Sequence, residues 1–160
     1  MTVFDIDGVL ADVSHRLHHL QGPQKDWDAF FDGASGDRVL LDGLAAVRRV
    51  ADLGRPMVYL SGRPERTRQI TLEWFACHGF PAAHLHLRPD SDRRPARIFK
   101  PTVLAGLGGP AGVEMVYDDD DAVVDQLRTL GYAVTHVLWG KSPVAQQALL
   151  DSAQERAGRT

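Results

Sequence analysis

The sequence predicts a doubly wound α/β domain, with helices on both faces of a parallel sheet of about five strands and a small helical cap insert. Three observations predict it. Short apolar runs alternate with helical patterns, glycines follow those helical patterns, and 160 residues suffice to bury one substantial core. No stretch has the composition of an interdomain linker, so we expect residues 1–160 to form a single domain.

Each element follows from its local pattern. Strands are expected where apolar runs are bounded by turn residues, at 2–6, 56–62, 84–87, 113–117 and 133–138. Helices are expected where apolar residues recur at helical spacing, at 40–53, 64–78, 120–130 and 143–156. Pro64 opens the second helix, and Gly54, Gly79 and Gly131 stop the first three. In the second helix, the residues expected to face inward are Ile70, Trp74 and Cys77.

Residues 12–38 interrupt this alternation, and we expect them to form the helical cap outside the sheet. The segment SHRLHHL places His15, His18 and His19 on one helical face. This leaves two interpretations, a zinc site or a lid helix over the active site, and we favour the lid. The aromatic residues expected to pack this lid, one of them a candidate for contact with a nucleobase, are Trp27, Phe30 and Phe31.

Composition limits the classes of function. The formal net charge of −3 argues against a protein dominated by nucleic-acid binding. The single cysteine excludes an intramolecular disulfide and suits a reducing cytoplasm. The N-terminal segment does not have the pattern of a signal peptide, and no apolar run approaches the length of a membrane span. We therefore expect a cytoplasmic protein with no membrane partner.

Polar residues end three of the expected strands. Asp5 ends the first, Ser61 the second and Asp118 the fourth. Because the carboxyl ends of parallel strands meet at one edge of the sheet, we expect these residues to converge there, with Asp7 just beyond. Two carboxylates about 4 Å apart repel by roughly 4 kcal/mol at an effective dielectric constant near 20. The cluster needs a cation, and oxygen ligands that share it with a substrate phosphate suit Mg²⁺.

The same edge offers groups for an anion. Ser61 and Gly62 lie between a strand and a helix expected from Pro64, whose free N–H groups would bind phosphoryl oxygens. Arg63 adds positive charge there. Lys100 follows the loop-like, basic segment SDRRPARIF and precedes a helix expected from its neighbouring proline, so its ammonium group can reach this edge.

The ordered segments DIDGVLAD, LSGR, Lys100 and YDDDDAVV resemble the four motifs of the haloacid dehalogenase superfamily of phosphotransferases. The resemblance implies Asp5 as a nucleophile that forms an aspartyl-phosphate, and Asp7 as the general acid and then base. It implies Ser61 and Lys100 as ligands of the phosphoryl group. The residues that it implies for the Mg²⁺ site are Asp5, Asp7 through its carbonyl, Asp118 and Asp119.

A finer resemblance lies in LRPDSDRRPARIFKPTVL, which is similar to the 3′-phosphatase domain of bacteriophage polynucleotide kinase. It implies Arg88 and Arg94 as further phosphate-binding residues. Five basic and two acidic residues between positions 88 and 100 suit a substrate with more than one phosphate. The chain is too short for an added kinase domain, and WGKS lacks the earlier glycine of a phosphate-binding loop. The resemblance therefore implies the phosphatase half, acting on 3′-phosphates of nucleic-acid ends or nucleotides, with a kinase or ligase as a separate partner.

Other interpretations stay open at this stage. DIDGVLAD also resembles the start of cytosolic 5′(3′)-deoxyribonucleotidases, whose substrates are mononucleotides. A non-catalytic module that binds nucleic-acid ends is the alternative from another class. Ser61 is alternatively a helix cap, Lys100 a surface lysine, and the arginines a solvated loop. In the run DDDD, Asp120 and Asp121 are expected in the first turn of a helix, where negative charge complements the helix dipole.

Overall fold

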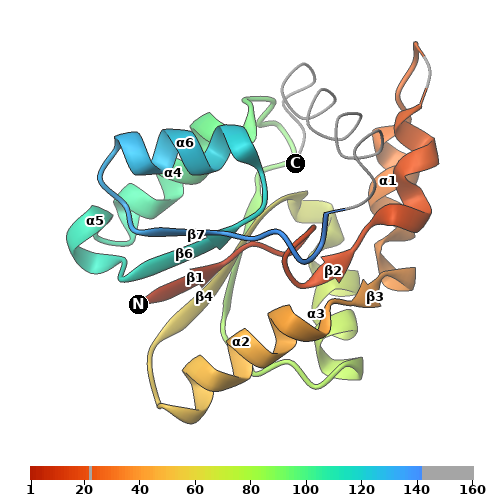
Figure 1. Ribbon diagram of the computed structural model, residues 1–160. Helices are drawn as coiled ribbons and strands as arrows, with labels where there is room; N and C mark the ends of the chain where they lie inside the picture. Colours follow the sequence, from red (N-terminus) through yellow and green to blue (C-terminus); the bar gives the residue numbers. More distant parts are fainter. Residues whose placement is uncertain (22, 142–160) are drawn as a thin grey trace.

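The computed structural model describes residues 1–21 and 23–141 and has a parallel sheet between two layers of helices (Figure 1). The strands are β1 (Thr2–Phe4), β2 (Ala11–Asp12), β3 (Arg38–Val39), β4 (Met57–Pro64), β5 (His84–Arg88), β6 (Met115–Asp118) and β7 (Val134–His136). Five of them form the main sheet in the order β5-β4-β1-β6-β7, and every neighbouring pair is parallel. The predicted doubly wound α/β fold is confirmed, with β1 at its centre.

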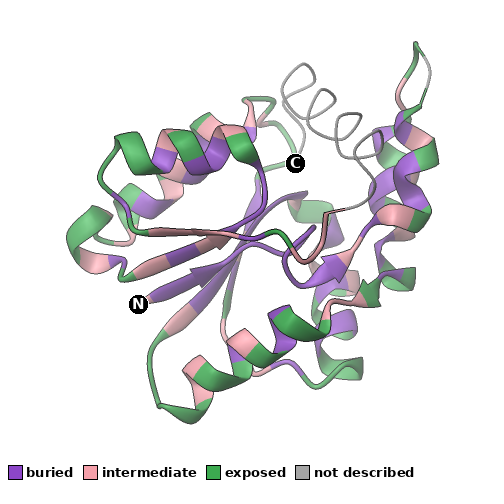
Figure 2. Cartoon of the chain, in the orientation of Figure 1, coloured by how far each residue is buried: buried purple, intermediate pink, exposed green. Residues whose placement is uncertain are grey.

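Helices cover both faces of this sheet. They are η1 (Ser14–Leu20), α1 (Trp27–Asp32), η2 (Gly33–Gly36), α2 (Leu41–Asp52), η3 (Glu65–Thr67), α3 (Arg68–Cys77), α4 (Ala96–Gly106), α5 (Gly109–Gly112) and α6 (Asp121–Thr129). Side chains alternate along β1, so Phe4 packs with the residues of α2 and α3, whereas Val3 packs with those of α4 and α6. Figure 2 shows the central strands buried on both sides, as expected for a parallel sheet.

The insert after β1 forms a helical cap at one end of the sheet. β2 and β3 pair as an antiparallel neck, with Asp12 opposite Arg38, and η1, α1 and η2 lie between them. The cap has a small apolar core of its own, made by Val13, Leu17, Leu20, Trp27, Phe30 and Phe31. The three aromatic side chains are therefore packing residues, as predicted, and the cap is a folded unit beside the carboxyl ends of the strands (Figure 1).

The second expected helix begins later than predicted. β4 continues to Pro64, because its register shifts beyond Leu60 and Pro64 still pairs with Arg88 of β5. A short η3 turn follows, and α3 begins only at Arg68. The prediction that helix N-terminal amides adjoin Ser61 and Gly62 is therefore wrong.

The inward face of α3 also differs from the prediction. Thr71, Trp74 and Phe75 are buried, whereas Cys77 is exposed. At 100° per residue, Cys77 lies about 120° from Thr71 around the helix, which takes it off the buried face. Trp74 is a core residue as expected.

The segment before Lys100 is helical rather than a loop. α4 begins at Ala96, directly after Pro95, and continues through Pro101. Lys100 therefore projects from within a helix and is buried, which rules out the surface-lysine interpretation. The helix predicted at 143–156 lies outside the described residues. Within the part of the chain that the structure describes, no helix has the length and apolar character that crossing a membrane requires.

Candidate active site

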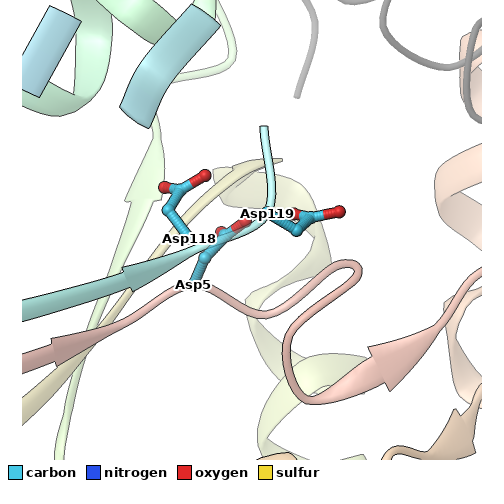
Figure 3. Close-up of side chains that lie close together, drawn as sticks. All are labelled: Asp5, Asp118 and Asp119. Carbon is cyan, nitrogen blue, oxygen red and sulfur yellow. The ribbon is translucent and has the colours of Figure 1, made fainter. Parts of the chain in front are cut away.

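Three aspartates meet at the carboxyl ends of the central strands (Figure 3). Asp5 directly follows β1, Asp118 ends β6 and Asp119 comes next. All three are buried, and one oxygen atom of each lies within 4.8 Å of the others. Parallel pairing brings them together, because Phe4 stands opposite Tyr117 in the register of β1 and β6. We call these three residues the acidic cluster.

Lys100 is the cation beside the acidic cluster. Its Nζ atom lies 2.7 Å from Oδ2 of Asp118 and 3.0 Å from Oδ2 of Asp5. When all three carboxylates are ionised, one lysine leaves an excess of two negative charges. Oxygen donors with this excess charge fit a divalent cation such as Mg²⁺.

Burial disfavours charge on the acidic cluster. It raises the pKa of Asp5 to about 7, with Lys100 opposing the shift and the charges of Asp118 and Asp7 adding to it. It also raises the pKa of Asp119 well above its ordinary value, and there Asp5 and Asp118 contribute as well. The cluster therefore takes up protons readily unless a cation compensates its charge.

Gly8 leaves room for the carboxylate of Asp119. The φ angle of Gly8 is +78°, and a Cβ atom there would lie 2.0 Å from Oδ2 of Asp119. Another residue would both strain the backbone and collide with the carboxylate. The glycine of DIDGVLAD thus permits a tight turn and the close approach of a metal-site candidate.

Asp7 belongs to a different set of charges, which we call the arginine network and which consists of Asp7, Arg16, Asp37 and Arg63. Both guanidinium groups bind Oδ1 of Asp7, from Nη2 of Arg63 at 2.6 Å and from Nη2 of Arg16 at 2.8 Å. Both also donate to Oδ2 of Asp37, at 2.7 and 2.8 Å respectively. All four residues are buried, and their two positive and two negative charges balance.

The arginine network keeps Asp7 ionised. Burial alone would raise the pKa of Asp7, but the guanidinium groups of Arg63 and Arg16 outweigh it and lower this pKa to about 2. The network uses only Oδ1 of the carboxylate. Oδ2 of Asp7 is buried and has no hydrogen-bond partner in the described structure. This oxygen is the atom available for proton transfer.

The predicted phosphate ligands occupy three different settings. Ser61 is buried near the end of β4, and its Oγ accepts a hydrogen bond from the backbone N–H of Arg63. The Arg63 side chain faces the arginine network, so its predicted contact with phosphate stays a prediction. Arg88 is buried and donates to the Arg94 carbonyl at 2.7 Å, while the Arg94 side chain is half exposed and pairs with Asp92.

A cavity of about 130 Å³ opens beside Gly62. Its walls come from the cap helix α1, the end of β4 and the segment that follows β5. Arg88 belongs to this lining, whereas Lys100 and the acidic cluster do not. The cavity therefore lies where β4 and β5 end, and the acidic cluster is not part of its lining.

The remaining aspartates of the DDDD run have structural roles. Asp120 caps α6 by accepting hydrogen bonds from the backbone N–H groups of Ala122 and Val123. Asp121 lies in the first turn of α6 and pairs with His136 and Lys141. Both positions agree with the expected first turn of a helix.

The histidines of the cap do not converge on a shared metal position. His15 Nε2 lies 2.9 Å from Oδ1 of Asp37, whereas the tilted rings of His18 and His19 have their centroids 3.9 Å apart. Among the described residues, the group of side chains suited to a metal ion is the acidic cluster.

Arg16 and Asp37 were missed by the sequence analysis. Arg16 stands among histidines in SHRLHHL, and Asp37 ends the insert, so neither belongs to a predicted strand end. The guanidinium of Arg16 lies 4.2 Å from the centre of the Phe30 ring, inside the cap. Only the fold of the cap brings these two residues to Asp7, and no local pattern signals it.

Comparison with protein families gives a match to the model described as "Polynucleotide kinase PNKP phosphatase domain", over residues 1–141. This range includes the cap, the acidic cluster and the arginine network. No curated protein matched the chain.

Comparison with solved structures supports the fold. A chain of the structure titled "Structure of Pnkp1/Rnl/Hen1 complex" superposes with a TM-score of 0.70 and 24% identity over 85% of this chain. This chain spans only 44% of that one. A haloacid dehalogenase-like hydrolase from Streptococcus pneumoniae has a TM-score of 0.62 and 12% identity, covering 97% of this chain and 90% of its own. An enzyme of the same superfamily from Bacteroides thetaiotaomicron, solved with magnesium and inorganic phosphate, has a TM-score of 0.53 and 11% identity, covering 90% and 96%.

Proposed function

The chain belongs to the PNKP phosphatase-domain family of the haloacid dehalogenase superfamily, and we propose that it is a Mg²⁺-dependent enzyme that removes 3′-phosphates from nucleic-acid ends or nucleotides. One observation carries the metal dependence: three buried carboxylates lie together, and a single lysine pairs with two of them. The donor set fits Mg²⁺. The ligands of the ion would be the carboxylates of Asp5, Asp118 and Asp119 and the backbone carbonyl of Asp7. When bound, the ion would neutralise negative charge on the transferred phosphoryl group.

Asp5 is the proposed nucleophile. Its carboxylate attacks phosphorus and forms an aspartyl-phosphate while the 3′-oxygen leaves. Lys100, 3.0 Å from Oδ2 of Asp5, would hold this carboxylate in position and offer its positive charge to the phosphoryl oxygens. Ser61, buried in the neighbouring strand β4, would donate a hydrogen bond from its hydroxyl group to the same phosphoryl group.

Asp7 is the proposed general acid and base. Its pKa of about 2 suits the second step, in which an ionised carboxylate takes a proton from the water that hydrolyses the aspartyl-phosphate. In the first step Asp7 must carry a proton to the leaving oxygen. The negative charge of a bound phosphate favours that protonation, because like charges disfavour the ionised form. Oδ2, outside the arginine network, would carry the proton in both steps.

Substrate comparison tests the proposal. We expect Mg²⁺-dependent release of phosphate from a 3′-phosphorylated oligonucleotide, and loss of that release when EDTA removes the metal. Activity on 5′-mononucleotides alone would favour the deoxyribonucleotidase alternative. Absence of phosphate release from every phosphomonoester, with binding to nucleic-acid ends retained, would favour a non-catalytic module.

A separate kinase or ligase is the proposed partner. The chain covers less than half of the matched chain in the Pnkp1/Rnl/Hen1 RNA repair complex. A phosphatase that removes the phosphate from a 3′-end would leave the 3′-hydroxyl group that a ligation step uses. We place this activity in the cytoplasm, in keeping with the exposed free thiol of Cys77. Purification of a tagged form of the chain from the cells that produce it would test this, with a kinase or ligase expected to co-purify.

A further inference from the structure

The cavity between α1 and the segment after β5 has the lining of a nucleotide subsite. Its apolar lining residues are Phe31, Pro64 and Pro89. Its cationic lining residues are Arg66, Arg88 and Arg93. Proteins that bind single strands combine these two features, because apolar side chains contact bases or sugars while cations contact phosphates. At about 130 Å³ the cavity has room for more than a single water molecule.

The acidic residues that line the cavity already have partners. Asp28 accepts a hydrogen bond from Arg66 Nη2 at 2.9 Å, and Asp90 accepts one from the Arg66 backbone N–H at 3.0 Å. Asp92 pairs with Arg94 at 2.6 Å. The side chains of Asp28 and Asp92 are thus paired with arginines, and Asp92 also interacts electrostatically with Arg88.

Arg93 differs from Arg66, the other exposed arginine of this lining, in its ion pairing. It is exposed and forms no ion pair with any residue in the described ranges 1–21 and 23–141. By contrast, Arg66 is bound by Asp28 and by Asp32, at 2.5 Å, and therefore fixes α1 to the end of β4. The lining of the cavity therefore includes a cap helix tied to Arg66 and, in Arg93, an exposed guanidinium without an ion-pair partner among the described residues.

The order of the strands gives a path from the acidic cluster to this cavity. Asp5 lies at the end of β1, Gly62 in neighbouring β4, and Arg88 at the end of β5, the next strand out. A substrate whose terminal phosphate sits at Asp5 would pass Gly62 and reach the cavity under α1. The part of a 3′-phosphorylated strand that continues in this direction is the nucleotide on the 5′ side of the terminal one.

We propose that this cavity binds the penultimate nucleotide of a nucleic-acid strand and that Arg93 pairs with its phosphodiester. The proposal rests on the proposed function and specifies its substrate as a polynucleotide end. A mononucleotide has no such phosphodiester. Arg93 is therefore a specificity-determining residue that lowers the barrier for strands and leaves mononucleotides unaffected.

The test compares Arg93→Gln with wild type on a 3′-phosphorylated oligonucleotide, a mononucleoside 3′-phosphate and p-nitrophenyl phosphate. We expect kcat/KM for the oligonucleotide to fall about fivefold at low salt, the upper end for one exposed ion pair. The salt dependence of log kcat/KM should become shallower by about 0.7, because one phosphate contact is lost. The values for the two small substrates should stay unchanged, and Arg93→Lys should recover part of the loss.

A matched control and a binding measurement complete the design. Arg49→Gln removes an exposed arginine from α2, on the opposite side of the sheet from α4, and should change none of these values. In an Asp5→Asn background, fluorescence anisotropy should show about fivefold weaker binding of the oligonucleotide when Arg93→Gln is added.

The outcomes separate the two levels of the proposal. Equal losses on all three substrates, or no loss on the oligonucleotide, would overturn the role of Arg93. A wild type that hydrolyses mononucleoside 3′-phosphates as well as the oligonucleotide would overturn the subsite and leave the phosphatase standing. A wild type without Mg²⁺-dependent hydrolysis of any of the three would overturn the proposed function and the subsite with it.

Discussion

Asp5 and Asp7 are two residues apart, yet they lie in electrostatically opposite surroundings. Asp5 shares Lys100 with Asp118, beside the buried Asp119, and its pKa rises to about 7. Asp7 and Asp37 face two buried guanidinium groups, and the pKa of Asp7 falls to about 2. The acidic cluster has an excess of negative charge that an external cation can compensate, whereas the arginine network is balanced by the protein itself. Adjacent carboxylates can thus take the roles of metal ligand and of ionised base.

Replacing the nucleophile should have the largest effect. We expect Asp5→Asn to lower phosphate release by about 1,000-fold or more, because no other carboxylate occupies its position. The metal-free variant should unfold at a slightly higher temperature than wild type, since one charge leaves an unbalanced cluster. Phosphate-release assays and thermal unfolding in EDTA would measure both effects. Retained turnover would show that another residue attacks phosphorus.

Removing one aspartate from the balanced network should be costly for the fold. Asp37→Asn leaves two buried guanidinium groups with one carboxylate, so the free energy of unfolding should fall by about 3–5 kcal/mol. Asp119→Asn is the matched change in the acidic cluster. It should leave the metal-free protein as stable as wild type or more stable, because burial disfavours this charge. The free energies of unfolding of the two variants can be measured by urea unfolding in EDTA. Equal destabilisation by Asp37→Asn and Asp119→Asn would contradict the difference proposed between the two sets of charges.

The acidic cluster should couple Mg²⁺ binding to pH. Burial lifts the folded-state pKa of Asp5 above its ordinary value of 3.8, so protonation stabilises the metal-free protein at low pH. That stabilisation is lost as the pH rises through about 7. Because Mg²⁺ competes with the proton, its affinity should weaken about tenfold for each pH unit below 7. Calorimetric titration at pH 6 and pH 8 measures this change, and equal affinities would show that Asp5 is ionised at both.

The smallest effect is expected at Asp120, which belongs to neither set of charges. Asp120→Ala removes the N-cap of α6 and should lower the free energy of unfolding by about 1 kcal/mol. Phosphate release should stay within about twofold of wild type, because Asp120 contacts Asp118 through its backbone N–H, at 3.1 Å from Oδ1, and alanine keeps that donor. A large loss of activity would extend the metal site further along the DDDD run.

Local sequence patterns were enough to predict the parallel sheet and several residues of the candidate site. Alternating apolar runs predicted the parallel sheet, and Asp5, Ser61 and Asp118 were expected at its carboxyl edge because polar residues follow those runs. The partners of Asp7 could not be predicted in this way. Arg16 and Asp37 are 21 residues apart and meet only where the cap folds back.

What the sequence determined is therefore the set of elements and the residues at their ends, since hydrophobic periodicity and parallel pairing are enough to place them. What only the tertiary structure decided is how the charges are shared. The register shift in β4 moved α3 away from Ser61, and the fold paired the buried Arg63 with Asp7 and Asp37. Charge pairing depends on distance and on exclusion of water, and both are properties of the folded chain.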